Sequence, residues 1–104
     1  MSITTANVTT TVGNVYVSSG NTAITFLSLC NYSVGNVIAN VHVVPNGASA
    51  NSINKILSSI QINTLDTFQL YAGGEKLLLD SGDSIQVNAS GNSAIGAVTS
   101  YTTI

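Results

Sequence analysis

The sequence predicts an all-β protein: a single antiparallel β-sandwich of about eight strands. Apolar residues recur with a period of two along most of the chain. Val, Ile and Thr, which suit half-buried pleated surfaces, make up 33 of the 104 residues. Clusters of Gly, Asn, Ser and Pro separate the apolar segments at intervals of about 8–20 residues, as turns do in sandwiches and barrels. We therefore expect one domain, jelly-roll-like or immunoglobulin-like in form.

The first segment, residues 1–11, is uncharged and contains neither Gly nor Pro. By itself it is too short to bury the surface that would order it. We expect either an arm that adds to the sheet of a neighbouring subunit or the first strand of its own sandwich. Its large apolar side chains, Ile3 and Val8, are candidate partner contacts. The sandwich domain proper is expected over residues 12–104.

Seven later segments have strand character. The alternation is cleanest over 83–90, where Ile85, Val87 and Ala89 are expected to face inward and Gln86 and Asn88 outward. The expected strands are 12–19, 22–30, 36–44, 52–62, 66–72, 83–90 and 96–104.

Apolar residues occupy both the odd-numbered and the even-numbered positions of the segment 22–30. A regular strand places Ile24, Phe26 and Cys30 on one face and Leu27 and Leu29 on the other. Cys30 is the single cysteine of the chain, which excludes an intramolecular disulfide. Because it ends an apolar run without nearby charge, we expect it to be buried as a small hydrophobic side chain. Phe26, and Phe68 in segment 66–72, are expected in the core.

The segment 52–62 fits two periods. Ile53, Ile56, Leu57 and Ile60 follow helical spacing, whereas the residues from 56 to 62 alternate as in a strand. The β-branched end and the neighbouring strands favour a strand, and a short helical turn over 54–57 is the alternative.

Two carboxylates, Asp80 and Asp83, flank Ser81-Gly82. With Asp66 they are candidates for a surface Ca²⁺ site. Asp and Ser-Gly are also typical turn residues, because the Asp side chain bonds nearby backbone. We therefore interpret 80–83 as the corner of a hairpin and predict no metal site.

The composition argues against several functions. Only 6% of the residues are charged and the formal net charge is −2, so the chain lacks the basic surface that nucleic-acid binding requires. His42 is the single histidine, and the chain has no second His and no second Cys to complete a metal site, so we interpret His42 as a strand histidine facing a polar surface or a neighbouring subunit. No nucleophile-elbow or phosphate-loop pattern is present. We expect no enzymatic activity, catalytic residue or cofactor.

Membrane association is not expected either. The N-terminal residues lack the basic and apolar regions of a signal peptide. The apolar runs are a few residues long, far below the roughly 20 that a membrane-spanning helix needs.

The order of these features resembles a family of small bacteriophage virion proteins found in cyanophages and other tailed phages of aquatic bacteria. The resemblance covers residues 12–104, and its most specific parts are "VHVVPNGASANSINKIL" and "DSGDSIQV". It implies a β-sandwich that serves as a capsid-decoration or cement, neck or tail component, in virions assembled in the host bacterial cytoplasm. The family implies no catalytic residues. At Asn63-Thr64-Leu65-Asp66 the chain departs from the Pro-Ala-Gly-Asp-like turn of the family.

Two classes of function follow. The first is a virion structural protein, most directly a decoration subunit, otherwise a tail, neck or fibre-associated part. Its expected partners are itself, as a homotrimer or another closed oligomer, and the major capsid protein, because uncharged edge strands leave association unopposed. The second is a carbohydrate-binding sandwich, for which Tyr32 and Tyr71, beside turns, are the candidate stacking platforms and partner contacts.

Overall fold

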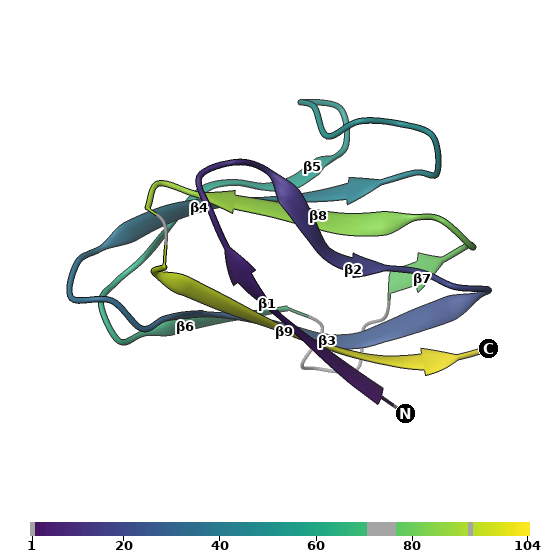
Figure 1. Ribbon diagram of the computed structural model, residues 1–104, viewed down its shortest axis with the longest axis horizontal. Coiled ribbons are helices and arrows are strands. Elements are labelled where there is room, and N and C mark those ends of the chain that lie inside the picture. The colour runs from purple at the N-terminus through teal and green to yellow at the C-terminus, as the bar shows by residue number, and fades with distance from the viewer. Residues whose placement is uncertain (1, 71–76, 92) are drawn as a thin grey trace.

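Two antiparallel sheets lie face to face with the core between them (Figure 1). The computed structural model describes residues 2–70, 77–91 and 93–104. Within these residues the chain forms nine strands and no helix. The strands are β1 (Ser2–Val8), β2 (Gly13–Val17), β3 (Thr22–Asn31), β4 (Val37–Val44), β5 (Lys55–Ile62), β6 (Thr67–Leu70), β7 (Leu77–Leu79), β8 (Ser84–Ala89) and β9 (Ile95–Thr103).

The strand order is that of a jelly roll. Sheet A has the order β1-β9-β3-β6, and β7 pairs with the same edge of β3 as β6 does. Sheet B has the order β2-β8-β4-β5. Among the described strands, the chain changes sheets at every connection except β4–β5 and β6–β7, which produces two interlocked Greek keys. The predicted β-sandwich is confirmed, and the placement of β1 and β2 in different sheets excludes the immunoglobulin-like order.

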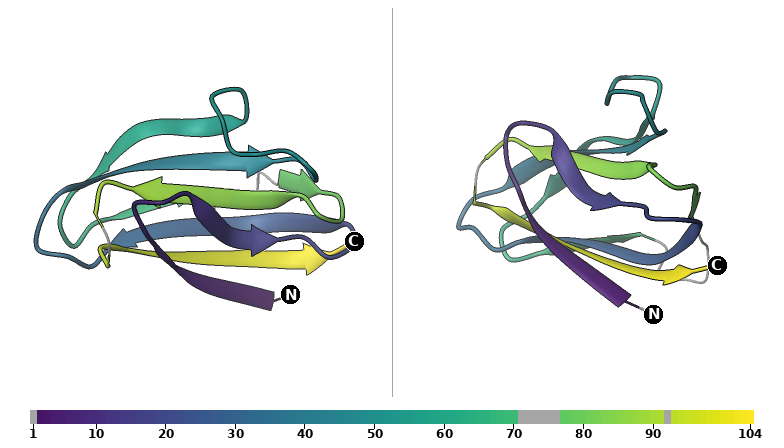
Figure 2. Two further views of the ribbon diagram at one scale, coloured as in Figure 1. Left: turned by 45° about the horizontal axis from the view of Figure 1, so that its top comes forward. Right: turned by 45° about the vertical axis from the view of Figure 1, so that its right-hand side comes forward.

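Most of residues 1–11 belongs to the sandwich itself. Ser2–Val8 form β1, which pairs with β9 from Ser2 opposite Tyr101 to Val8 opposite Ile95. Figure 2 shows β1 running along β9 at the outside of sheet A. Val8 is only 2% exposed and lies in the core. Of the two alternatives for this segment, the structure therefore contains the first strand rather than a detached arm.

The inward faces of both sheets form one apolar core, as period-two patterning requires. Ile85, Val87 and Ala89 all face inward and are at most 5% exposed, as predicted. Burying a side chain of the size of Ile85 or Val87 contributes about 1.5–3 kcal/mol. In the segment 52–62, residues 55–62 form strand β5, residues 52–54 are a turn before it, and the alternative helical turn over 54–57 is not formed.

A β-bulge in β3 changes which side chains face the core. Ile24 lies opposite Tyr101 of β9, and the next partners are Phe26 and Ser100, so Thr25 is an extra residue. The Thr25 hydroxyl donates to the carbonyl oxygen of Ser100 at 3.2 Å. Before the bulge the even-numbered residue Ile24 faces the core, and after it the odd-numbered residues do.

Because of this change, Ile24 lies on the same face as Leu27 and Leu29, and all three are at most 1% exposed. Phe26 and Cys30 therefore lie on the outer face of sheet A, and Cys30 is exposed. The predictions that Cys30 is buried and that Phe26 is in the core were wrong. Both assumed an unbroken strand. Phe68 packs against the core, as predicted.

The turn at residues 80–83 connects the two sheets. Its flanking strands are β7 in sheet A and β8 in sheet B, so the expected hairpin is not formed. The turn closes through a hydrogen bond from the Asp83 N–H to the Asp80 carbonyl oxygen at 3.1 Å. Gly82 has φ +89°, and a Cβ there would lie 2.5 Å from Cγ of Asn46, so both conformation and space require glycine.

The side chain of Asp83 holds this corner together. Its Oδ2 accepts a hydrogen bond from the Asp80 N–H and its Oδ1 accepts one from the Asn46 N–H, both at 2.9 Å. The backbone of the corner also exchanges hydrogen bonds with Ser18, from Ser18 N–H to Asp83 O at 2.8 Å and from Gly82 N–H to Ser18 O at 2.9 Å. Three loops, β2–β3, β4–β5 and β7–β8, are thus joined at one end of the sandwich.

The two carboxylates of the corner should contribute unequally to stability. We expect Asp83→Ala to lower the free energy of unfolding by about 2 kcal/mol, because two charge-assisted hydrogen bonds are lost. Asp80→Ala is the matched control, since no hydrogen bond of its carboxylate is present among the described contacts, and it should cost less than about 0.5 kcal/mol. Urea unfolding measures both values, and equal losses would contradict the assignment.

Candidate functional site: the outer face of sheet A

The described side chains on the outer face of sheet A that come from β1, β9, β3 and β6 are uncharged. The register places side chains from β1, β9, β3 and β6 side by side in rows, because directly opposed residues in antiparallel strands share a face. None of these side chains is ionised. The rows are Asn7, Gly96, Cys30 and Thr67; Thr5, Val98, Ser28 and Gln69; and Ile3, Ser100 and Phe26.

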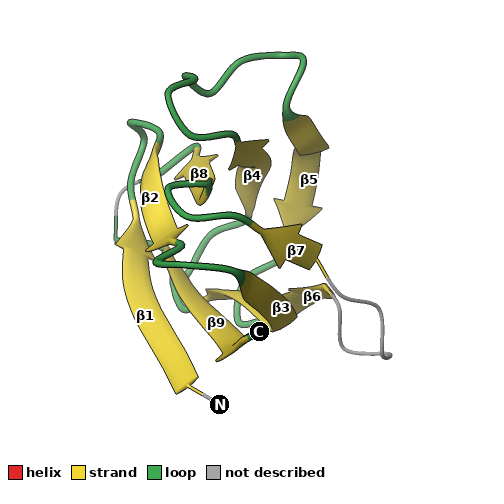
Figure 3. Ribbon diagram, turned by 90° about the vertical axis from the view of Figure 1, so that its right-hand side faces the viewer, coloured by secondary structure: helices red, strands yellow, loops and turns green. Residues whose placement is uncertain are grey.

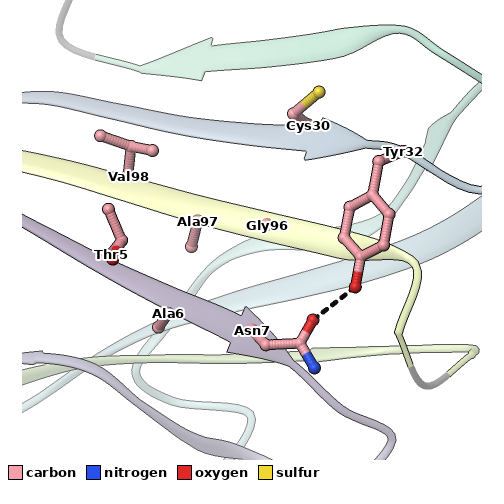
Figure 4. A pocket seen from close by; sticks show the side chains of 8 residues that line it. All are labelled: Thr5, Ala6, Asn7, Cys30, Tyr32, Gly96, Ala97 and Val98. Carbon is pink, nitrogen blue, oxygen red and sulfur yellow. Dashed lines mark hydrogen bonds between the residues drawn. The ribbon is translucent and has the colours of Figure 1, made fainter.

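A depression of about 520 Å³ lies in this face beside β1 (Figure 4). Gly96 has no side chain, so its row is hollow between Asn7 of β1 and Cys30 of β3. Strands β1, β3 and β9 and the residue after β3 supply the lining, which is Thr5, Ala6, Asn7, Cys30, Tyr32, Gly96, Ala97 and Val98.

The ring of Tyr32 forms one wall of the depression. It lies across β9 at Gly96, where a Cβ on the glycine would be 3.9 Å from the ring carbons Cδ2 and Cε2. The Tyr32 hydroxyl donates to Oδ1 of Asn7 at 2.8 Å, and the Tyr32 N–H donates to the carbonyl oxygen of Ala94 at 2.9 Å. The side chain remains 51% exposed. An aromatic surface held at both ends is preorganised for binding, because little rotamer entropy is left to lose.

The predicted contact residues have different positions. Ile3 is 68% exposed on the outer face of β1, and Tyr32 borders the depression. Val8, also proposed as a partner contact, is buried in the core, because the even-numbered residues of β1 face inward. Tyr71 lies outside the described residues.

Sequence reasoning missed Asn7 and Gly96, which fix the Tyr32 ring. They lie 25 and 64 positions from Tyr32 in the chain, and no local pattern connects them. The glycine had a usable signal, since a glycine inside a β-branched strand often marks a close approach of another group.

The carboxylates and the histidine do not converge. Asp80 and Asp83 lie near the start of β3, whereas the carbonyl oxygen of Asp66 accepts a hydrogen bond from Asn31 N–H at the end of that strand. His42 is buried in sheet B, opposite Gln86 of β8, and its Nδ1 has no hydrogen-bond partner among the described residues. The described part of the chain contains no group of three or more His, Cys, Asp or Glu residues arranged to hold a metal ion.

Comparisons with protein-family models, with curated proteins and with solved structures found no match. The relation to phage virion proteins therefore stays a prediction from the sequence motifs. Within residues 2–70, 77–91 and 93–104, no helix has the length and apolar character needed to cross a membrane.

The contacts of Tyr32 with Asn7 and Gly96 should make a modest contribution to stability. We expect Tyr32→Phe, which removes the bond to Asn7 at an exposed site, to cost about 0.5 kcal/mol. Tyr32→Ala also removes the ring packing over Gly96 and should cost about 1–2 kcal/mol. Urea unfolding distinguishes the two variants. A larger loss for Tyr32→Phe than for Tyr32→Ala would contradict the packing described above.

Proposed function

We propose that the protein is a non-enzymatic structural subunit of a tailed-phage virion, most directly a capsid decoration or cement protein. The observation that carries this proposal is the outer face of sheet A, whose described rows contain no charged side chain. Jelly rolls are common in viral capsid and lectin domains, which agrees with this role but does not specify it. The proposal names a phage particle because the sequence motifs resemble those of small phage virion proteins.

The chemistry of the face suits lasting contact with another protein. Charged groups cost several kcal/mol each to remove from water unless they are paired, and this face has none in its rows. Thr, Ser, Asn and Gln side chains can exchange hydrogen bonds with a partner, and Val98, Phe26 and Ile3 supply apolar contact. Such a face can become buried against a capsid protein without stranding a charge.

A charge placed in this face should weaken particle binding. We expect Cys30→Glu, at an exposed central position, to reduce occupancy on virions at least tenfold, since an unpaired carboxylate would be buried. Gln61→Glu on β5 of sheet B is the matched control, because it is also exposed and should leave occupancy unchanged. Occupancy is measured by quantitative blotting of sedimented particles, with circular dichroism to verify that both variants fold. Equal occupancy for both variants would contradict the use of this face.

The location on the virion is tested separately. Virions of the encoding phage are dissociated into heads and tails, and the protein is located by immunogold electron microscopy. Labelled heads support the decoration role, whereas labelled tails or necks support the alternative of a tail, neck or fibre-associated part. Absence from both contradicts the proposal.

A second candidate is carbohydrate binding, favoured by the fixed Tyr32 ring beside the depression. Sugars stack on exposed aromatic faces and bond to neighbouring amides and hydroxyls, and Asn7 and Thr5 lie at this site. A glycan array with the intact protein tests it. Binding that Tyr32→Ala abolishes would favour this function, and an array without signal would leave the structural role.

A further inference from the structure

A sandwich exposes four sheet edges, and three of them carry features that hinder pairing with another chain. Strand β2 has five residues and a register break, and β5 has two register breaks and Lys55. The edge of β3 opposite β9 is covered by two short strands, β6 with four residues and β7 with three.

Strand β1 lacks these features. It pairs with β9 over seven consecutive residues without a register break, and it contains no charge and no proline. Its pairing partner among the described strands is β9 alone, so its other edge faces outward. Figure 3 shows β1 at the flank of the sandwich with no drawn strand beyond it. Such an edge is suited to adding one more antiparallel strand.

The side chains of β1 indicate which strand fits. Ile3 is an exposed apolar side chain on the outer face, and Asn7, on the same face, lines the depression. In an antiparallel pair of two identical strands with Thr5 opposite Thr5, Ile3 of each copy lies opposite Asn7 of the other. The same edge thus provides both the apolar side chain and the side chain that it meets, so the register is self-complementary, as a twofold contact requires.

We propose that two copies of this chain pair β1 with β1 in antiparallel fashion about a twofold axis at Thr5. Each Ile3 then packs against Asn7 at the rim of the other copy's depression, and the two A sheets join into one continuous sheet. No like charges meet in this register, and Thr5 opposite Thr5 is a favourable cross-strand pair. This contact produces a twofold dimer, which is a closed oligomer other than the homotrimer named first from the sequence.

The inference deepens the proposed structural role and rests on it for its biological use. Its test is separate, because self-association is measured on the purified protein and occupancy on virions. A dimer that does not bind particles would contradict the proposed function alone, and a particle-bound monomer would contradict this inference alone.

Sedimentation equilibrium over a series from micromolar to millimolar protein tests the contact. We expect a monomer–dimer equilibrium for the unmodified chain and at least a tenfold weaker dimer for Ile3→Asp. The matched control is Ile53→Asp, which introduces the same change at a side chain that is 95% exposed in the β4–β5 loop, and it should leave the dimer unchanged. Monomer throughout, or equal weakening by both variants, would overturn the proposal.

Disulfide trapping tests the register. In a Cys30→Ser background, Thr5→Cys places two thiols at the twofold axis, where opposed Cα atoms about 4.5–5.5 Å apart permit a disulfide. Ile3→Cys places its two thiols four residue steps apart along the paired strands, beyond disulfide reach. Oxidised dimer that forms faster for Thr5→Cys than for Ile3→Cys supports the pairing. The reverse order, or no dimer from Thr5→Cys, overturns it.

Discussion

The bulge at Thr25 determines which side chains of β3 face the core and which form the outer face of sheet A. Strand β3 is the central strand of that sheet, hydrogen-bonded to β9 on one edge and to β6 and β7 on the other. One extra residue lets Ile24 and Leu27 face the core together, although their separation of three would place them on opposite faces of a regular strand. Without it, either Ile24 or both Leu27 and Leu29 would be exposed to water, so the apolar sequence itself favours the bulge.

The same phase change produces the outer surface. It directs Cys30 outward, next to the Gly96 position of β9, and the missing side chain there leaves space for the Tyr32 ring. Tyr32 then reaches across β9 to Asn7 and connects the end of β3 with the edge strand β1. A packing requirement inside the sandwich thus determines an uncharged face, a depression and a fixed aromatic ring outside it.

Much of the fold was predictable because it depends on local pattern. The alternation of Ile85, Val87 and Ala89 identified β8 and its inward face, and the residues Ser81-Gly82 identified a turn. The bulge was not predictable. Apolar residues occur at both odd and even positions of 22–30, so the sequence does not show which set faces the core. The hairpin was wrong because turn residues show that the chain reverses but not which sheet it enters. Of the site, Tyr32 was proposed from its place beside a turn and Ile3 from its apolar character in the N-terminal segment, whereas Asn7 and Gly96 join them through pairing that only the register reveals.

The reactivity of Cys30 tests the phase of β3 most directly. A chromogenic disulfide reagent is added to the folded protein and, separately, to the protein in denaturant, and the rates of thiol release are compared. The bulged strand predicts that folded Cys30 reacts within about tenfold of the denatured rate, because the thiol is exposed at the depression. Protection by a factor of about a thousand or more, as for a thiol that reacts only after unfolding, would place Cys30 in the core and contradict the outer face described above.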